Sequence, residues 1–325
     1  MFADRRRSLA ALLGCCLAAA CADAPAASGD QPSASPEAAD CAAAPLGLQV
    51  LGSGGPIAEG SRAGTSYVVW IDGTARLLVD AGPGSFIRFG EAGLTLADFD
   101  AIAFTHFHAD HSGGIAGIFN SGSFEASDEP LPVIGPAAGS VFPGVRRFLE
   151  AQFGREAGAW RYLGGYLDGG DGRRRLEIRE IEATDEEQAP TTRIEIAPDL
   201  ALTAIPVHHG EVPTLAYRVE AEDRTILFAA DQSAFSTGFD RVTRGLEPDL
   251  LVAHHVIPEG DGQPIGLHRP PGEIGKMAAR IAPGRLVLSH HMERSLAKLD
   301  ESLNAIAGHY DGQPLVAADG TCVTI

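Results

Sequence analysis

Residues 101–114 have the sequence AIAFTHFHADHSGG and constrain the fold more than any other segment of this 325-residue chain. The apolar run at their start predicts a buried strand. His106 and His108 follow two positions apart, so in an extended loop their side chains point the same way, and Asp110 and His111 come directly after. Neutral imidazoles suit zinc and iron, and a carboxylate offsets the charge of a cation. Four ligand-type side chains within six residues predict a site for two neighbouring metal ions.

The other histidines are grouped rather than scattered. The chain has eleven histidines, and all but His309 lie in tight groups, each at the end of a predicted strand or close to one. Beyond residue 111 these groups are His208 and His209, His254 and His255, His268, and His290 and His291. This placement, more than the number of histidines, marks them as candidate site residues.

Strand-rich and helix-rich stretches occur in both halves of the chain. They predict an α/β fold with two sheets packed face to face and helices outside, as a single domain over residues 45–325. The predicted strands are 46–51, 65–71, 75–79, 101–105, 175–181, 192–196, 200–207, 215–220, 225–229, 250–253 and 286–289, with a final hairpin over 315–325 that turns at Asp319-Gly320. The longer predicted helices are 142–165, 271–281 and 293–307.

The first 44 residues have the composition of an export signal followed by a tether. Basic residues precede an apolar run, and small residues end this run before Cys21. This order predicts a signal peptide over residues 1–21, with Cys21 as a lipid acceptor or else as a spare residue of an ordinary signal. Residues 22–44, rich in Ala, Ser and Pro, predict a flexible linker. We expect an exported bacterial protein, either periplasmic or held at the membrane by its lipid alone.

Two of the five cysteines, Cys41 and Cys322, lie outside the predicted signal. In an oxidising compartment two such cysteines can form a disulfide, which here would tie the two chain ends together. A disulfide also requires a short Cα separation, which the sequence does not give. A bridge and two free thiols therefore both remain open.

These motifs resemble the metallo-β-lactamase superfamily, and within it the branch of RNase Z, arylsulfatase and phosphodiesterase-like enzymes. The resemblance runs from about residue 46 to the end of the chain. It implies a four-layer αββα sandwich with the metals at the edge between the two sheets. The segment IPVHHG at 205–210 is similar to a motif of this branch in which the histidine before glycine is the ligand. The resemblance therefore favours His209 over His208.

Two more motifs complete the ligand set that the resemblance implies. LFAAD at 227–231 looks like the motif that supplies a bridging aspartate, here Asp231, and LVLSH at 286–290 resembles the motif of the last ligand, His290 rather than His291. One metal would then be held by His106, His108 and His209, and the other by Asp110, His111 and His290, with Asp231 between them. The expected cofactors are two divalent ions, zinc first, with manganese or iron as alternatives.

The same resemblance suggests a hydrolytic mechanism. Two neighbouring cations lower the pKa of a shared water from near 16 to about 7, and the hydroxide attacks an electrophilic centre. The candidate catalytic residues are Asp110, His268 and His254. In this branch a histidine at the place of His268 protonates the leaving group, and a glutamate supports it. His254 stands where that glutamate is expected, which is a departure from the pattern.

The net charge of −18 argues against a polyanionic partner such as RNA. We expect a small anionic ester, a phosphodiester or an aryl sulfate. The alternatives are a lactone, a β-lactam, RNase Z-like RNA cleavage, a lipid-anchored metal-binding protein without turnover, and a mononuclear iron dioxygenase. RNA cleavage is disfavoured because a single hairpin stands where RNase Z carries a flexible basic arm. Residues 142–166 are either a lid over the metals or a helix packed on a sheet.

Overall fold

The computed structural model describes residues 41–125, 127 and 129–325. The predicted signal peptide of residues 1–21, its lipid acceptor Cys21 and most of the predicted linker lie outside the described residues. Within the described residues, no helix combines the length and the apolar character that crossing a membrane requires.

Two seven-stranded sheets form the centre of the fold. The first sheet has the order β14 (Cys322–Thr324), β1 (Leu46–Gly52), β2 (Ser66–Ile71), β3 (Thr74–Val79), β4 (Ala101–Ala103), β5 (Leu131–Pro136) and β6 (Leu176–Ile181). The second sheet has the order β13 (Leu315–Val316), β12 (Arg285–Ser289), β11 (Leu250–His254), β10 (Arg224–Phe228), β9 (Thr214–Ala221), β8 (Leu200–Val207) and β7 (Thr192–Ala197). In the first sheet the three pairings from β14 to β3 are antiparallel and the three from β3 to β6 are parallel. In the second sheet the three pairings from β7 to β10 are antiparallel and the three from β10 to β13 are parallel.

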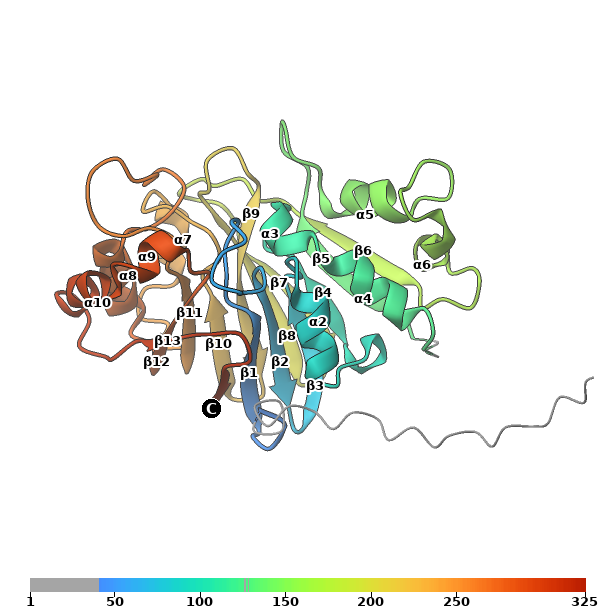
Figure 1. Ribbon diagram of the computed structural model, residues 1–325, viewed down its shortest axis with the longest axis horizontal. Coiled ribbons are helices and arrows are strands. Elements are labelled where there is room, and N and C mark those ends of the chain that lie inside the picture. The colour runs from blue at the N-terminus through green and yellow to red at the C-terminus, as the bar shows by residue number, and fades with distance from the viewer. Residues whose placement is uncertain (1–40, 126, 128) are drawn as a thin grey trace, which may run out of the picture. The chain divides into compact units, whose positions relative to one another are not determined.

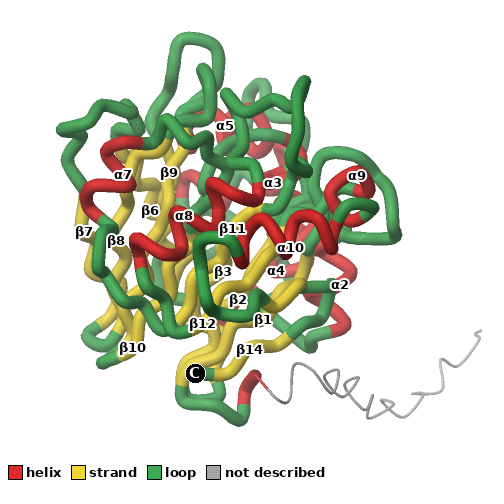
Figure 2. Tube along the Cα trace, turned by 90° about the vertical axis from the view of Figure 1, so that its left-hand side faces the viewer, coloured by secondary structure: helices red, strands yellow, loops and turns green. Residues whose placement is uncertain are grey.

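Helices cover the outer face of each sheet. The first sheet carries α2 (Ser85–Glu91), α4 (Ile115–Gly122), α5 (Val145–Phe153) and α6 (Gly165–Asp168), and the second carries α7 (Thr237–Val242), α8 (Pro271–Ile281) and α10 (Leu299–Ala307). Shorter helical segments are η1 (Leu96–Asp98), α3 (Ala109–Ser112), η2 (Arg161–Leu163) and α9 (Glu293–Leu296). Figure 1 shows the strands between these two sets of helices, and Figure 2 shows α8 and α10 in front of the second sheet. The predicted αββα sandwich is confirmed.

Apolar periodicity explains each layer. In β1, Leu46, Leu48 and Val50 alternate with residues of the other face and are buried between the sheets, as the period of two in a strand requires. In α8, buried residues recur three or four positions apart along the face that packs on the second sheet, which is the spacing of an amphipathic helix; they include Ile274, Met277, Ala278 and Ile281.

The end of the chain differs from its prediction. The predicted hairpin over 315–325 is wrong, because β13 pairs with β12 in the second sheet whereas β14 pairs with β1 in the first. The chain crosses between the sheets at Asp319, whose carboxylate accepts hydrogen bonds from the backbone N–H groups of Ser53 and Ala63. The turn at Asp319-Gly320 therefore serves a crossover instead of a hairpin.

Three further elements differ. Strand β5 was not predicted, since Pro132, Gly135 and Pro136 are residues that strands usually avoid. The predicted helix 293–307 is two helices, α9 and α10, and the predicted helix 142–165 is shortened to α5 with η2 after it.

A disulfide joins Cys41 and Cys322, with Cα atoms 5.6 Å apart. Cys41 is fully buried and packs against the first sheet. The last residues of the predicted linker 22–44 are therefore part of the folded domain. In Figure 1 the C-terminus, which follows Cys322, lies at the end of the strands opposite α3.

Candidate metal centre

Five strands bring the candidate site residues to one edge of the sandwich. In the first sheet β4 leads into His106. In the second sheet β8, β10, β11 and β12 run in the same direction and end at or shortly before His209, Asp231, His254 and His290. Strands that run in parallel end at the same edge, where α/β proteins usually place their sites.

The first ligand group consists of His106, His108 and His209. Nε2 of His106 lies 3.1 Å from Nδ1 of His108, which lies 3.4 Å from Nε2 of His209. Burial lowers the pKa of all three imidazoles, so they are neutral at pH 7 and can present lone pairs. Three neutral imidazoles that face one point are a ligand set of catalytic zinc sites.

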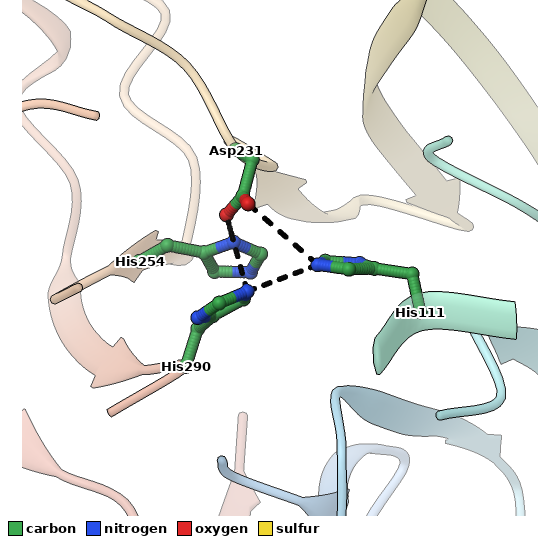
Figure 3. Close-up of side chains that lie close together, drawn as sticks. All are labelled: His111, Asp231, His254 and His290. Carbon is green, nitrogen blue, oxygen red and sulfur yellow. Dashed lines mark hydrogen bonds and ion pairs between the residues drawn. The ribbon is translucent and has the colours of Figure 1, made fainter. Parts of the chain in front are cut away.

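The second group contains His111, Asp231, His254 and His290 (Figure 3). Nε2 of His111 lies 3.0 Å from Nε2 of His290, and the Asp231 carboxylate lies 3.7 Å from the first and 3.4 Å from the second. Asp110 reaches the same point, with Oδ2 3.3 Å from Nε2 of His290. Oδ2 of Asp231 also lies 3.6 Å from Nε2 of His209. This carboxylate therefore connects the two groups.

His254 orients Asp231. Burial lowers the pKa of His254 to about 3, so its ring is neutral and carries one proton. Burial raises the pKa of Tyr67, so its hydroxyl stays protonated and donates to Nε2 of His254 over 3.1 Å. The ring proton is then on Nδ1, which donates to Oδ1 of Asp231 over 2.6 Å. Both nitrogens of His254 are engaged, and the ring acts as a support for the carboxylate.

Two other predicted ligands, His111 and His209, are oriented by contacts at Nδ1 of their rings. Asp80 accepts hydrogen bonds from the backbone and hydroxyl of Thr105 and lies 2.8 Å from Nδ1 of His111. Nδ1 of His209 donates to the backbone carbonyl of Leu267 over 2.9 Å. Such contacts fix ring orientation and leave the opposite nitrogen free for a metal.

The charges of the second group fit a cation. Asp80, Asp110 and Asp231 are buried around His111. Burial by itself lowers the pKa of His111, but Asp80 and Asp231 raise it well above its ordinary value. Burial also opposes the ionisation of Asp231, yet His290 and the other histidines hold its pKa well below its usual range. Buried carboxylates in this number require a compensating positive charge, which a divalent ion provides.

Close packing and strained backbone hold His290 in place. Its φ is +56°, a conformation that non-glycine residues seldom adopt and that often marks functional sites. A Cβ atom on Gly55 would lie 2.8 Å from the His290 ring, so only glycine fits beside it.

The structure brings together all seven predicted ligands: His106, His108, Asp110, His111, His209, Asp231 and His290. The adjacent histidines that were not predicted as ligands, His208 and His291, have other partners. Nδ1 of His208 lies 2.8 Å from the Ser233 hydroxyl, and His291 contacts His255. His268 lies at the site, with Nδ1 3.8 Å from Asp231.

His254 stands where a glutamate of the family would support His268, and the structure places its ring against Asp231. Among the described residues, His254 bonds to Asp231 and Tyr67. The reason is that β11 neighbours β10 in the sheet, so His254 emerges directly beside Asp231. Tyr67 and Asp80 were not recognised as site residues. The only sequence signal for Asp80 was its place at the end of a predicted strand.

The segment 142–166 is a packed layer and not a lid. Val145, Leu149 and Tyr166 are fully buried against the first sheet. Phe142, at its start, lies beside the site, with its ring 5.4 Å from that of His108.

A four-layer sandwich with two groups of histidine and aspartate at one edge is the architecture of a metal-dependent hydrolase. A family model described as a beta-lactamase superfamily domain matches residues 75–291, and the chain belongs to the metallo-β-lactamase superfamily. It is a hydrolase of this superfamily, and its fold and ligand groups indicate divalent metal ions.

Relatives and solved structures agree with this family. A ribonuclease Z of Mycolicibacterium paratuberculosis is 27% identical over 273 residues, which are 80% of this chain and 91% of the relative. The fold is similar to the metallo-beta-lactamase fold protein YhfI of Bacillus subtilis, with a TM-score of 0.65, 18% identity and coverage of 86% and 99% of the two chains. It is also similar to the short form of human tRNase Z, with a TM-score of 0.63, 20% identity and the same coverage.

Proposed function

We propose that this protein uses two divalent metal ions to hydrolyse a small anionic ester, a phosphodiester or an aryl sulfate. The observation that carries the proposal is Asp231, whose carboxylate lies within 3.7 Å of His111, His209 and His290 and so connects the two ligand groups. His106, His108 and His209 would hold one ion and Asp110, His111 and His290 the other, and a pair of ions bound there would lower the pKa of a water to about 7 and stabilise an anionic transition state.

The surrounding side chains have separate tasks. Tyr67 and His254 keep Asp231 in one orientation. His268 is the candidate proton donor to the leaving group. Burial lowers its pKa to about 4, so at pH 7 its ring is neutral and would donate its single N–H proton. Its Nδ1 atom is buried at the site and has no hydrogen-bond partner among the described residues, so it is free to exchange a proton there.

Charge supports a small substrate over RNA. The loops 137–144, 208–213, 232–236 and 256–268 follow strands at the site edge, and they contain no lysine or arginine. RNA recognition depends on such cations for contact with phosphates. In addition, β9 and β10 are joined by a tight turn at Glu222-Asp223, at the place where RNase Z carries its flexible basic arm. The similarity to ribonuclease Z keeps precursor-tRNA cleavage as the competing function.

The test is a hydrolysis panel with zinc- or manganese-loaded protein. The substrates are bis-p-nitrophenyl phosphate, p-nitrophenyl sulfate, a lactone, a cephalosporin and a precursor tRNA. We expect turnover of the first or second, and a fall of more than about 100-fold in Asp231→Ala, because the residue connects both ligand groups. Asp223→Ala is the matched control, since this aspartate is exposed at the β9–β10 turn.

Metal content is measured on the same samples. Two ions per chain in the wild type and fewer in Asp231→Ala are expected. Cleavage of precursor tRNA alone would establish the competing function, and two bound ions with no turnover of any substrate would indicate a metal-binding protein. A single iron ion per chain would favour the dioxygenase alternative.

The disulfide between Cys41 and Cys322 supports our further proposal that the protein is exported, since such bonds persist in oxidising compartments. Cell fractionation of the full chain, with and without residues 1–21, tests it. Equal amounts in the cytoplasm in both cases would contradict export.

A further inference from the structure

Apolar side chains that the reaction itself does not require lie on the loops that follow strands ending at the metal centre. Val141, Phe142, Phe235, Ile265 and Leu267 lie on three loops that follow β5, β10 and β11. Four of them are large and exposed, at 70% for Val141, 58% for Phe235, 51% for Ile265 and 37% for Leu267. We refer to these five residues as the apolar rim.

Two members of the rim contact the ligand groups directly. The ring of Phe142 lies 5.4 Å from that of His108, and the ring of His108 lies 5.2 Å from that of His209. On the other side, the Leu267 side chain lies over Gly210, where an added Cβ would be 2.8 Å from Cδ2 of Leu267. An ester bound at the first ligand group would therefore lie near Phe142 and Leu267.

The loops that carry the rim are held in position. A Cβ on Gly139 would lie 2.6 Å from the ring of Pro213, so the loop of Phe142 packs on the loop that follows His209. The backbone carbonyl of Leu267 accepts the hydrogen bond from His209. Phe235 packs its ring 5.7 Å from that of His208. Exposed apolar residues that cluster on anchored loops beside a site are typical of ligand recognition.

The charges on these loops exclude a polyanion. The loops 137–144, 208–213, 232–236 and 256–268 carry Glu211, Glu259 and Asp261 as their only charged residues apart from histidine. On these loops a substrate with further phosphates would meet negative charge and no lysine or arginine, and the cation near His268 is Arg294, which is held by the carbonyl of Val256. A suitable substrate has one reacting anionic group and an apolar remainder. Its anionic group would bind at the metal centre, and its apolar remainder would contact the apolar rim.

We infer that the apolar rim is the specificity element of this enzyme, and that it selects esters whose non-reacting group is an aryl or alkyl chain. This inference rests on the proposed hydrolytic function and narrows its substrate class. Phe142 and Leu267 are the specificity-determining residues.

The experiment compares two phosphodiesters with the same leaving group, phenyl p-nitrophenyl phosphate and methyl p-nitrophenyl phosphate. The ratio of their kcat/KM values is measured for zinc-loaded wild type and for the variant Phe142→Ala/Leu267→Ala. Because the intrinsic reactivities of the esters are common to both proteins, they cancel in this comparison. We expect the preference for the phenyl ester to fall about tenfold in the variant, the scale of a lost apolar contact in a binding pocket.

Phe124→Ala is the matched control. Phe124 is also an exposed phenylalanine, at 88%, but it follows the end of α4 that is farther from the ligands. We expect it to keep the wild-type ratio. Leu267→Ala alone removes the side chain and leaves the carbonyl that holds His209, so it tests the rim without loss of that bond.

A binding measurement separates the proposed hydrolytic function from the proposed role of the apolar rim. Calorimetry of phenylphosphonate and methylphosphonate with the zinc-loaded proteins gives a second ratio that does not depend on turnover. If neither ester is hydrolysed but wild type prefers phenylphosphonate and the variant does not, the proposed function fails and the rim stands. If the wild type and the variant show equal ratios in both measurements, the inference is overturned. The apolar rim would then serve to contact another surface, such as a membrane or a protein.

Discussion

Asp231 illustrates how single residues set this metal centre. Its carboxylate is ionised although it is buried, and its direction is set by His254 and then by Tyr67. A carboxylate that lies between two ligand groups gains from a fixed direction, because its Oδ1 atom faces His290 and its Oδ2 atom faces His209. Hydrogen bonds behind metal ligands commonly change metal affinity by 10- to 100-fold.

Tyr67→Phe removes the hydroxyl that directs His254 and leaves the ring in place. We expect zinc affinity to fall about tenfold, because His254 can then adopt either tautomer and Asp231 loses its fixed partner. Competition with a chromogenic chelator measures this change.

Tyr166→Phe is the control for that prediction. Tyr166 is equally buried and donates to the carbonyl of Phe119 over 2.9 Å, within the core between α4, α5 and the first sheet. Both variants should lose about 1 kcal/mol of stability with their hydrogen bond. Equal zinc affinity in the two variants would refute the role of Tyr67.

At the residue scale, the sequence identifies ligands that are close together in the chain. It does not identify the hydrogen-bond partners that orient these ligands from distant strands. His106, His108, Asp110 and His111 could be recognised because they lie within six residues. The contact of His254 with Asp231 could not, because it depends on the pairing of β10 with β11. The contact of Asp80 with His111 likewise depends on β3 lying beside β4.

At the scale of elements, most strands and α8 follow from apolar period and turn residues, and the exceptions have physical causes. The turn signal at Asp319-Gly320 is the same for a hairpin as for a crossover. The outcome is decided by the partner strands β1 and β12, which are distant in sequence. Likewise, the pairing of β5 with β4 and β6 overrides the preference of its prolines and glycine for loops.

Two helical glycines should respond in opposite ways to alanine. In α8, a Cβ on Gly275 would lie 2.7 Å from the carbonyl oxygen of Ile306 in α10, whereas a Cβ on Gly90 in α2 would meet nothing within 4 Å. We expect Gly275→Ala to lower the free energy of unfolding by about 1 to 3 kcal/mol through overpacking. Gly90→Ala should raise it by about 0.5 to 1 kcal/mol. Urea denaturation measures both, and a stabilised Gly275→Ala would show that α8 and α10 can separate without cost.

The whole molecule is built from two halves with the same succession of strand pairings. The fourth and last strand of the antiparallel part, β3 in one sheet and β10 in the other, leads into Asp80 and Asp231 respectively. Backbone with positive φ occurs at both places, at Asp80 and at Ala230. The sequence predicted two similar halves from its alternation of strands and helices. It contains no detectable repeat, because sheet pairing can be kept while side chains diverge.

Removal of the disulfide should separate stability from chemistry. It joins residues 281 positions apart, so Cys41→Ser/Cys322→Ser frees the ends of nearly the whole domain. We expect a loss of about 2 to 4 kcal/mol in unfolding free energy, with metal content unchanged because Cys41 and Cys322 pack in the cluster between the first sheet and its outer helices and not among the metal ligands. Reductant should destabilise the wild type and leave the double variant as it was. A loss of bound metal in the variant would contradict this separation.

The split of β13 and β14 between the two sheets bears on how the protein is made. Both sheets receive an outer strand from residues 315–325, so neither sheet is complete until this segment has been synthesised. A copy that stops before residue 315 would present β1 and β12 as open edges, which are templates for pairing with other chains. Prematurely ended copies should therefore collect in aggregates instead of persisting as weakened enzyme.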